Sequence, residues 1–199
     1  MTEAKKYNVL PLDASFAERG DPSIRPSLTR GRKHFEYYEG AVRIPEGSAP
    51  NFRNNSWNIT ADVITQKNAH GVFATMGGYF GGLSLMIKDD KPIFMYRLSN
   101  QPKHYTIITG TQKLSPGAHK ISVDFVYDGG GMGKGATAIL LVDGKKVGEA
   151  HIPQTIGIRF SLDETFDIGE DTGTPVEFAV YDVPYRFNGK LNKVIVDLK

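Results

Sequence analysis

Apolar and polar residues alternate in short runs along most of the chain, and glycine, proline and polar residues separate these runs. Residues 119–127 are the clearest case, because Ile121, Val123 and Phe125 would point to one face while the residues between them are polar. A period of two residues is typical of a β-strand with one buried face. The same pattern predicts strands over residues 58–65, 71–76, 83–88, 93–98, 104–109, 136–142 and 146–152, and within 185–198.

The segments between these runs favour an all-β fold. Asp143 and Gly144 are a strong signal for a two-residue hairpin. No window of about 11 residues places apolar residues at helical spacing. Strands that recur at roughly 8–12-residue spacing are typical of an antiparallel β-sandwich or jelly roll. We therefore expect a single β-sandwich domain over residues 34–199.

The beginning of the chain differs from the rest. Residues 1–33 show no sustained period, and Pro22 and Pro26 would interrupt a helix. We expect these residues to form an extended N-terminal arm or linker that lies on the domain. The basic run at residues 30–34 is interpreted as a solvated turn.

Composition limits the function classes. The 199 residues are enough for one sizeable core, and there is no cysteine, which excludes disulfides and thiolate chemistry within the chain. Lysine and arginine number 24 against 22 acidic residues, so the small net charge of +2 argues against nucleic acid as a partner. No apolar run of about 18 residues predicts a membrane span. The sequence also shows no signal peptide, so we expect a soluble chain whose export signal, if the protein is exported, lies outside it.

Residues 163–176 are unusually acidic. The spacing of their carboxylates fails the EF-hand pattern, because Ile168 and Thr174 stand where glycine and glutamate are needed. A calcium site of another type could use Asp163, Asp167 and Asp171. The competing interpretation is structural, since Asp and Thr side chains close turns by bonding nearby backbone N–H groups. We expect that the protein requires no cofactor, and calcium is the one candidate for a bound metal ion.

Aromatic residues supply a second candidate site. Sugar-binding sandwiches use aromatic platforms beside polar groups, and such rings are also ordinary strand and core residues. Paired carboxylates of a glycosidase are a weaker signal, because any acidic loop offers them. The candidate ligand-binding set lies on or between neighbouring predicted strands and comprises Trp57, Tyr79, Tyr96, Arg97, His104 and Tyr105, with Phe80 beside them.

A series of segments resembles the C-terminal region of a group of bacterial arylsulfatases. The segment Arg159-Phe-Ser-Leu-Asp-Glu-Thr-Phe-Asp-Ile-Gly-Glu-Asp-Thr-Gly-Thr-Pro-Val176 is the most specific of them. The others, in order, are Gly77-Gly-Tyr-Phe-Gly-Gly-Leu-Ser-Leu, Asp90-Lys-Pro-Ile-Phe-Met-Tyr, Pro116-Gly-Ala-His-Lys, Tyr127-Asp-Gly-Gly-Gly-Met-Gly-Lys-Gly, Leu141-Val-Asp-Gly-Lys-Lys-Val-Gly and Phe187-Asn-Gly-Lys-Leu-Asn-Lys-Val-Ile-Val-Asp-Leu. Residues 7–13 resemble the segment that links this region to the sulfatase catalytic domain.

The resemblance implies a concanavalin/laminin-G-like sandwich that is accessory to catalysis. Sulfatases act through a cysteine or serine that is oxidised to formylglycine, and the nearest match here, at residues 20–24, has Gly20 at that position. We therefore expect a non-catalytic domain that packs on a sulfatase catalytic domain, or on a second copy of itself, and shapes substrate access. The parent family, cytoplasmic or periplasmic, hydrolyses sulfuric esters. Two alternatives stay open: a carbohydrate-binding, lectin-like module and a self-standing enzyme that uses the acidic stretch.

Overall fold

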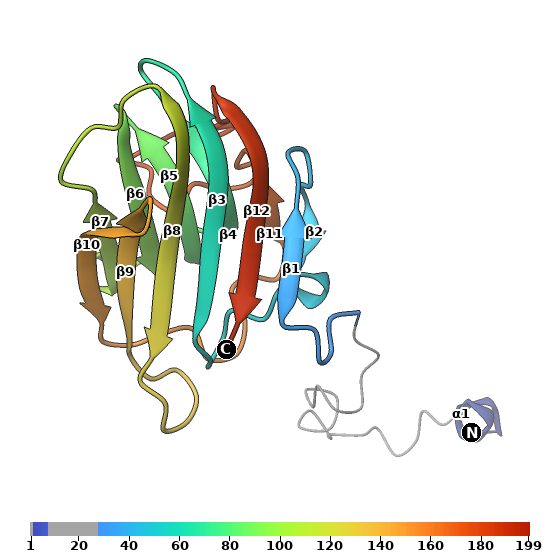
Figure 1. Cartoon of the computed structure of the whole chain (residues 1–199). Coiled ribbons are helices and arrows are strands. Elements are labelled where there is room, and N and C mark those ends of the chain that lie inside the picture. The colour runs from blue at the N-terminus through green and yellow to red at the C-terminus, as the bar shows by residue number, and fades with distance from the viewer. Residues whose placement is uncertain (1, 8–27) are drawn as a thin grey trace.

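Two antiparallel six-stranded sheets pack face to face in the computed structural model, which describes residues 2–7 and 28–199 (Figure 1). In spatial order, the first sheet contains β1 (His34–Tyr37), β12 (Lys190–Leu198), β3 (Trp57–Thr65), β8 (Gly117–Tyr127), β9 (Ala136–Val142) and β10 (Lys145–Ile152). The second contains β2 (Ile44–Pro45), β11 (Thr165–Ile168), β4 (Gly71–Gly78), β5 (Gly81–Lys88), β6 (Lys91–Arg97) and β7 (Tyr105–Thr109). The predicted all-β sandwich is confirmed.

The strands that sequence alternation missed are short. These are β1, β2 and β11, and β11 lies inside the acidic stretch. The helices of the described residues are also short: α1 (Thr2–Lys6) and the 3₁₀ turns at Glu46–Ser48 and Pro102–His104. Among residues 2–7 and 28–199, no helix has the length and apolar character needed to cross a membrane.

The predicted N-terminal arm falls only partly within the structure. Thr2–Lys6 is helical, whereas an extended segment was expected, and residues 1 and 8–27 lie outside the described residues. Glu3 in its first turn and Lys5 and Lys6 in its last match the polarity of a helix dipole. The boundary between arm and domain at residues 33 and 34 stays a prediction.

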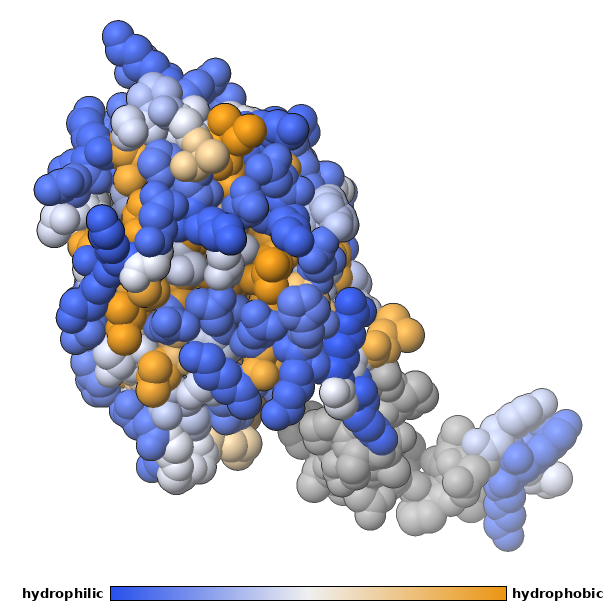
Figure 2. Space-filling model, in the orientation of Figure 1, coloured by the Kyte–Doolittle hydropathy of each residue, from blue (hydrophilic) through white to orange (hydrophobic). Residues whose placement is uncertain are grey.

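The first sheet has one buried and one solvent-facing side. Along β3 every second residue from Trp57 to Thr65 is buried, as the period of two requires. Trp57 stacks on Phe125 of the neighbouring strand β8, with ring centroids 4.4 Å apart. The opposite side of this sheet faces the viewer in Figures 1 and 2, and it is mainly hydrophilic with hydrophobic residues scattered through it.

The central strands of the second sheet, β4 and β5, are buried on both sides. All residues of β4 are buried, and in β5 only Lys88 is partly exposed. A second hydrophobic cluster lies outside the sandwich core, where the chain segment after β11 contributes Val176 and Tyr181. These side chains cover Met86 and Met95 of the sheet. The segment after β11 therefore acts as a third layer, and it positions the candidate site.

Tight turns follow the glycine pattern. Asp143 and Gly144 both have positive φ, 51° and 77°, as a type I′ hairpin between β9 and β10 needs. Between β4 and β5 the constraint is close approach, because a Cβ on Gly77 would lie 2.1 Å from the carbonyl oxygen of Gly81. Only glycine fits there, and the tight turn places Tyr79 and Phe80 between β4 and β5.

Candidate functional site

The candidate site is a groove of about 340 Å³ at the β4–β5 turn. One wall is the turn itself, and the other is the start of the acidic stretch. The lining residues are Gly78, Tyr79, Phe80, Gly81, Phe160, Ser161, Leu162, Asp163, Glu164 and Thr174. The structure thus brings together members of the two candidate sets, aromatic and acidic, that the sequence placed about 80 residues apart.

Exposed apolar side chains form the rim of the groove. Phe80 is 73% exposed and Leu162 is 87% exposed. Tyr79 is half-buried and contacts Phe80 edge to face, with ring centroids 5.7 Å apart. On its other side Tyr79 lies 5.0 Å from the ring of Phe178, which is also exposed. Three neighbouring rings therefore meet solvent at one end of the second sheet.

Arg97 fixes this aromatic group from below. Its side chain is only 2% exposed, and its guanidinium carbon lies 4.4 Å from the ring centre of Tyr79 and 4.5 Å from that of Tyr105. Nε donates to the carbonyl of Val176 at 2.7 Å, and a terminal nitrogen forms an ion pair with Glu177. A cation between two aromatic rings is a stabilising arrangement when it is desolvated. Three predicted residues, Tyr79, Arg97 and Tyr105, are therefore in direct contact.

Tyr105 and His104 support the site and do not line it. The Tyr105 hydroxyl is buried without a hydrogen-bond partner among the described residues. Burial, reinforced by the charge of Glu177 and opposed by Arg97, raises the pKa of Tyr105 to about 12. His104 Nδ1 lies 2.7 Å from Ser99 Oγ, which closes the connection between β6 and β7. Both residues hold the edge of the sheet on which Arg97 rests.

Trp57 and Tyr96 are core residues, and the prediction is corrected for these two. Both are almost fully buried between the sheets, where Trp57 Nε1 donates to the carbonyl of Phe52 at 3.1 Å. The Tyr96 hydroxyl accepts a hydrogen bond from the backbone N–H of Ile156 at 2.7 Å. Their rings point into the sandwich, so neither can stack on a ligand at the surface.

Glu164 is the carboxylate held most closely against the groove. Its Oε2 accepts a hydrogen bond from the backbone N–H of Thr174 at 3.2 Å. A Cβ on Gly173 would lie 2.0 Å from Oε2, and one on Gly78 would lie 3.3 Å from Oε1, so bare backbone surrounds the carboxylate. Oε1 accepts no hydrogen bond from the described residues. It is also not one of their fully buried polar atoms that lack a partner, so solvent reaches it. It is free to accept one from a ligand.

Asp163 and Asp167 are in different environments. Asp163 is exposed at the groove, and its Oδ1 accepts from Ser161 Oγ at 2.9 Å. Asp167 is 1% exposed, and its oxygens accept from the backbone N–H groups of Arg43 and Thr172 at 2.5 and 2.9 Å. The hydroxyls of Thr165 and Thr172 donate to the same carboxylate at 3.0 and 2.5 Å. Four hydrogen-bond donors therefore satisfy the carboxylate of Asp167.

Asp171 completes a hydrogen-bonded path to the aromatic group. The Tyr181 hydroxyl donates to Asp171 Oδ2 at 2.6 Å and accepts from the N–H of Val176 at 3.0 Å. The carbonyl of Val176 in turn accepts a hydrogen bond from Arg97 Nε. Within residues 2–7 and 28–199, no three acidic or histidine side chains are arranged to hold a metal ion. Asp163, Asp167 and Asp171 therefore do not form the predicted calcium ligand set there, and their contacts favour the structural interpretation.

The buried Asp171 predicts a pH-dependent stability. Desolvation, with the nearby charges of Asp167 and Glu164, raises its pKa from 3.8 to about 6, while hydrogen bonds from Tyr181 and Gly173 oppose the shift. A carboxyl with a raised folded pKa adds stability that is complete below the unfolded value and is lost as pH rises through the folded value. Relative to Asp171→Asn, the wild type should lose about 2–3 kcal/mol between pH 4 and pH 7. Urea unfolding of both proteins at the two pH values measures this, and an unchanged difference contradicts it.

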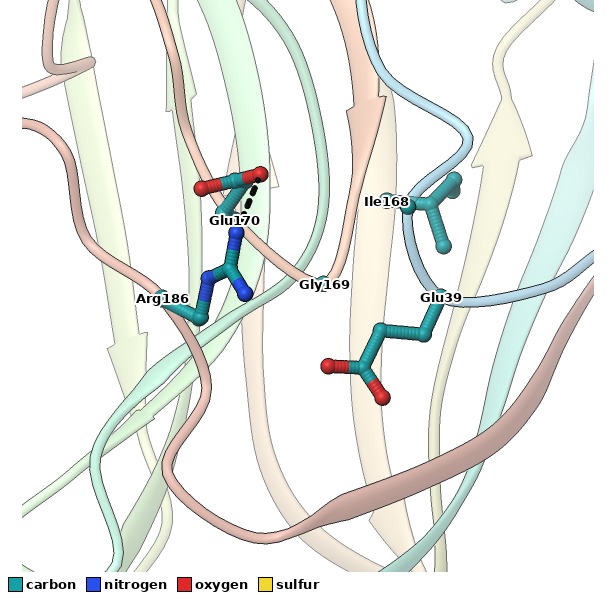
Figure 3. A pocket seen from close by; sticks show the side chains of 6 residues that line it. Glu39, Ile168, Gly169, Glu170 and Arg186 are labelled. Atoms are coloured by element: carbon teal, nitrogen blue, oxygen red, sulfur yellow. Dashed lines mark hydrogen bonds and ion pairs between the residues drawn. The ribbon is translucent and has the colours of Figure 1, made fainter.

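A second cavity of about 300 Å³ lies beside β11 and was not predicted (Figure 3). Arg186 and Glu170 form an ion pair on one side of it, with a nitrogen–oxygen distance of 3.1 Å, and Glu39 from the segment after β1 lies on the other side. No aromatic ring lines it. Of the groove residues, Ser161, Leu162 and Glu164 were not among the predicted site residues.

Comparison with known proteins identifies solved structures that have a similar fold. No protein-family model and no curated protein matches the chain. The structure is similar to the Ruminococcus gnavus IT-sialidase CBM40 bound to α2,3-sialyllactose, with a TM-score of 0.53, 14% identity, and coverage of 83% of this chain and 89% of that one. The same domain bound to α2,6-sialyllactose gives a TM-score of 0.51, 13% identity, and coverage of 83% and 90%.

The fold is a concanavalin/laminin-G-like β-sandwich. Domains LG4-5 of the mouse laminin α1 chain match with a TM-score of 0.48 and 13% identity over 84% of this chain. The match spans 39% of that laminin chain. Identities this low show the fold alone, and none of these matches bears on the resemblance to arylsulfatases, which stays a prediction.

Proposed function

We propose that the chain is a non-catalytic, carbohydrate-binding β-sandwich module whose site is the groove at the β4–β5 turn. The observation that carries this proposal is Phe80, a ring 73% exposed at the rim of a groove that also contains carboxylate and hydroxyl acceptors. A sugar ring presents an apolar face and several O–H donors. An aromatic side chain covers the first, and the carboxylates of Glu164 and Asp163 accept the second.

The rigidity of the turn supports the proposal. Preorganised contacts bind better because less side-chain and loop freedom is lost on binding. Phe80 follows Tyr79, whose ring is held by Arg97, and the turn lies between glycines that pack against neighbouring backbone. The acidic stretch, which was the candidate for an independent enzyme, uses Asp167 and Asp171 in internal hydrogen bonds. The carboxylates left at the groove, Asp163 and Glu164, serve as acceptors.

Phe80→Ala tests the site. We expect about tenfold weaker binding of a glycan, the loss of one well-placed aromatic contact. The free energy of unfolding should change by no more than about 0.5 kcal/mol, because the ring is mostly in solvent. A glycan array identifies the glycan, and calorimetric titration compares the variant with the wild type.

Tyr38→Ala is the matched control for Phe80→Ala. Tyr38 is another exposed aromatic residue, 59% exposed, and it does not line the groove. This variant should bind as the wild type does. Failure of the wild type to bind any glycan on the array would overturn the proposed function, and equal weakening by both variants would place binding elsewhere.

The second candidate is an accessory domain that packs on an arylsulfatase catalytic domain. It is favoured by the exposed apolar side chains Phe80, Leu162 and Phe178, a set that another domain could cover, and by the sequence resemblance to that family. On this hypothesis the pure chain does not turn over an aryl sulfate. It does bind a separately produced catalytic domain, and Leu162→Ser with Phe178→Ser weakens that complex. Turnover by the pure chain would rule out an accessory role.

A further inference from the structure

The groove is acidic, and no basic side chain lines it among the residues that the structure describes. Among its lining residues Asp163 and Glu164 are charged, and neither lysine nor arginine is present. Arg97, the cation beneath it, is buried and paired with Glu177. An anionic ligand would therefore meet two carboxylates with no compensating charge from the lining. This charge distribution decides what class of glycan fits.

Glu164 is the residue that can distinguish anionic glycans from neutral or amino glycans. Its Oε2 is committed to the N–H of Thr174, which orients the carboxylate, and Oε1 is left without a donor from the described residues. The glycines on both sides carry no side chain, which lets the backbone approach the carboxylate closely. An unpaired carboxylate oxygen accepts a hydrogen bond from a hydroxyl or an ammonium, and it repels a sulfate or carboxylate.

We propose that the groove selects glycans without anionic groups, neutral or amino sugars, and that Glu164 Oε1 accepts the hydroxyl or amino group that determines this choice. The inference rests on the proposed function, because it concerns the same groove. It also separates this site from the acidic sialyl ligands of the similar CBM40 structures. Each anionic group near the carboxylates should weaken binding about tenfold.

Glu164→Gln provides a test with a reversed outcome. The amide oxygen would stay with the Thr174 N–H, so the NH₂ group would replace Oε1 and turn an acceptor into a donor. Binding of an amino or neutral glycan should fall about tenfold, while binding of a sulfated or sialylated counterpart should rise. A purely structural defect would weaken all ligands together, so the opposite directions identify a role in selection.

The experiment uses the full chain on a glycan array with neutral, amino, sialylated and sulfated classes. It is followed by calorimetry of glucosamine tetramers that are free, N-acetylated or N-sulfated. Glu149→Gln on β10 is the control, since it removes the same charge from the other sheet and should change nothing. Preference for an anionic class, or parallel losses in Glu164→Gln, would overturn the inference and leave the proposed function standing. Binding to no class would overturn both.

Discussion

Replacing Arg97 by methionine is expected to lower the free energy of unfolding by about 3–5 kcal/mol. The change removes one partner of an ion pair in which Arg97 is 2% exposed and Glu177 is 17% exposed. It also leaves the carbonyl of Val176 without its donor, and removes the cation between the rings of Tyr79 and Tyr105. Methionine keeps most of the volume, so the loss reports charge and hydrogen bonding more than a cavity.

Two further variants separate these contributions. Arg97→Lys keeps the charge and loses the planar fork that reaches Val176 and Glu177 together, so an intermediate loss is expected. Arg97→Met combined with Glu177→Gln removes the unpaired carboxylate and should recover part of the stability. Urea denaturation measures all three. A loss below about 1 kcal/mol in Arg97→Met would show that the pair does not hold this layer.

The same variant should affect the groove. Tyr79 would lose the cation that contacts its ring, so the turn that carries Phe80 would lose one of its supports. Glycan binding should therefore weaken in Arg97→Met although Arg97 does not line the groove. Arg97 is in this sense a positioning residue, and Arg97→Lys should restore part of the affinity.

Local signals predicted the sandwich well. Alternation over β8 and the Asp143–Gly144 turn depend on neighbours in sequence, so they could be read without the structure. β11 could not, because its pattern of Phe166, Asp167 and Ile168 has a buried carboxylate in the middle. Four donors make that burial favourable, and one of them, the N–H of Arg43, comes from a segment 124 residues away that the local pattern does not identify.

The aromatic set shows which part of a site the sequence can specify. Trp57 shares its strand face with Ile59 and Val63, so its burial follows from the period of two. Arg97 and Tyr105 are directly opposite across β6 and β7, a register that depends on the connection between those strands. The covering layer that buries Arg97 comes from the segment after β11, which is why a charged strand residue became a buried support.

Asp167→Asn is expected to destabilise the protein by about 3–4 kcal/mol. An amide has one acceptor oxygen, whereas the backbone N–H groups of Arg43 and Thr172 approach different oxygens of the carboxylate. One of these N–H groups would face the new NH₂ group and stay unpaired in a buried place. Thermal unfolding should show a fall in Tm of roughly 10 °C.

Two further measurements test the role of Asp167: the stability of Asp163→Asn as a control, and the effect of calcium on stability. Asp163 is exposed, so its variant should stay within about 0.5 kcal/mol of the wild type. If Asp167 is a structural acceptor, the loss in Asp167→Asn is the same in calcium and in chelator, because the four donors already satisfy the carboxylate. A rise in Tm with calcium that disappears in Asp167→Asn would instead make it a metal ligand, with stabilisation of about 2.7 kcal/mol at a hundredfold excess over Kd. The hydrogen bonds around Asp167 favour the first outcome, in which this carboxylate joins β11 to the segments around Arg43 and Thr172.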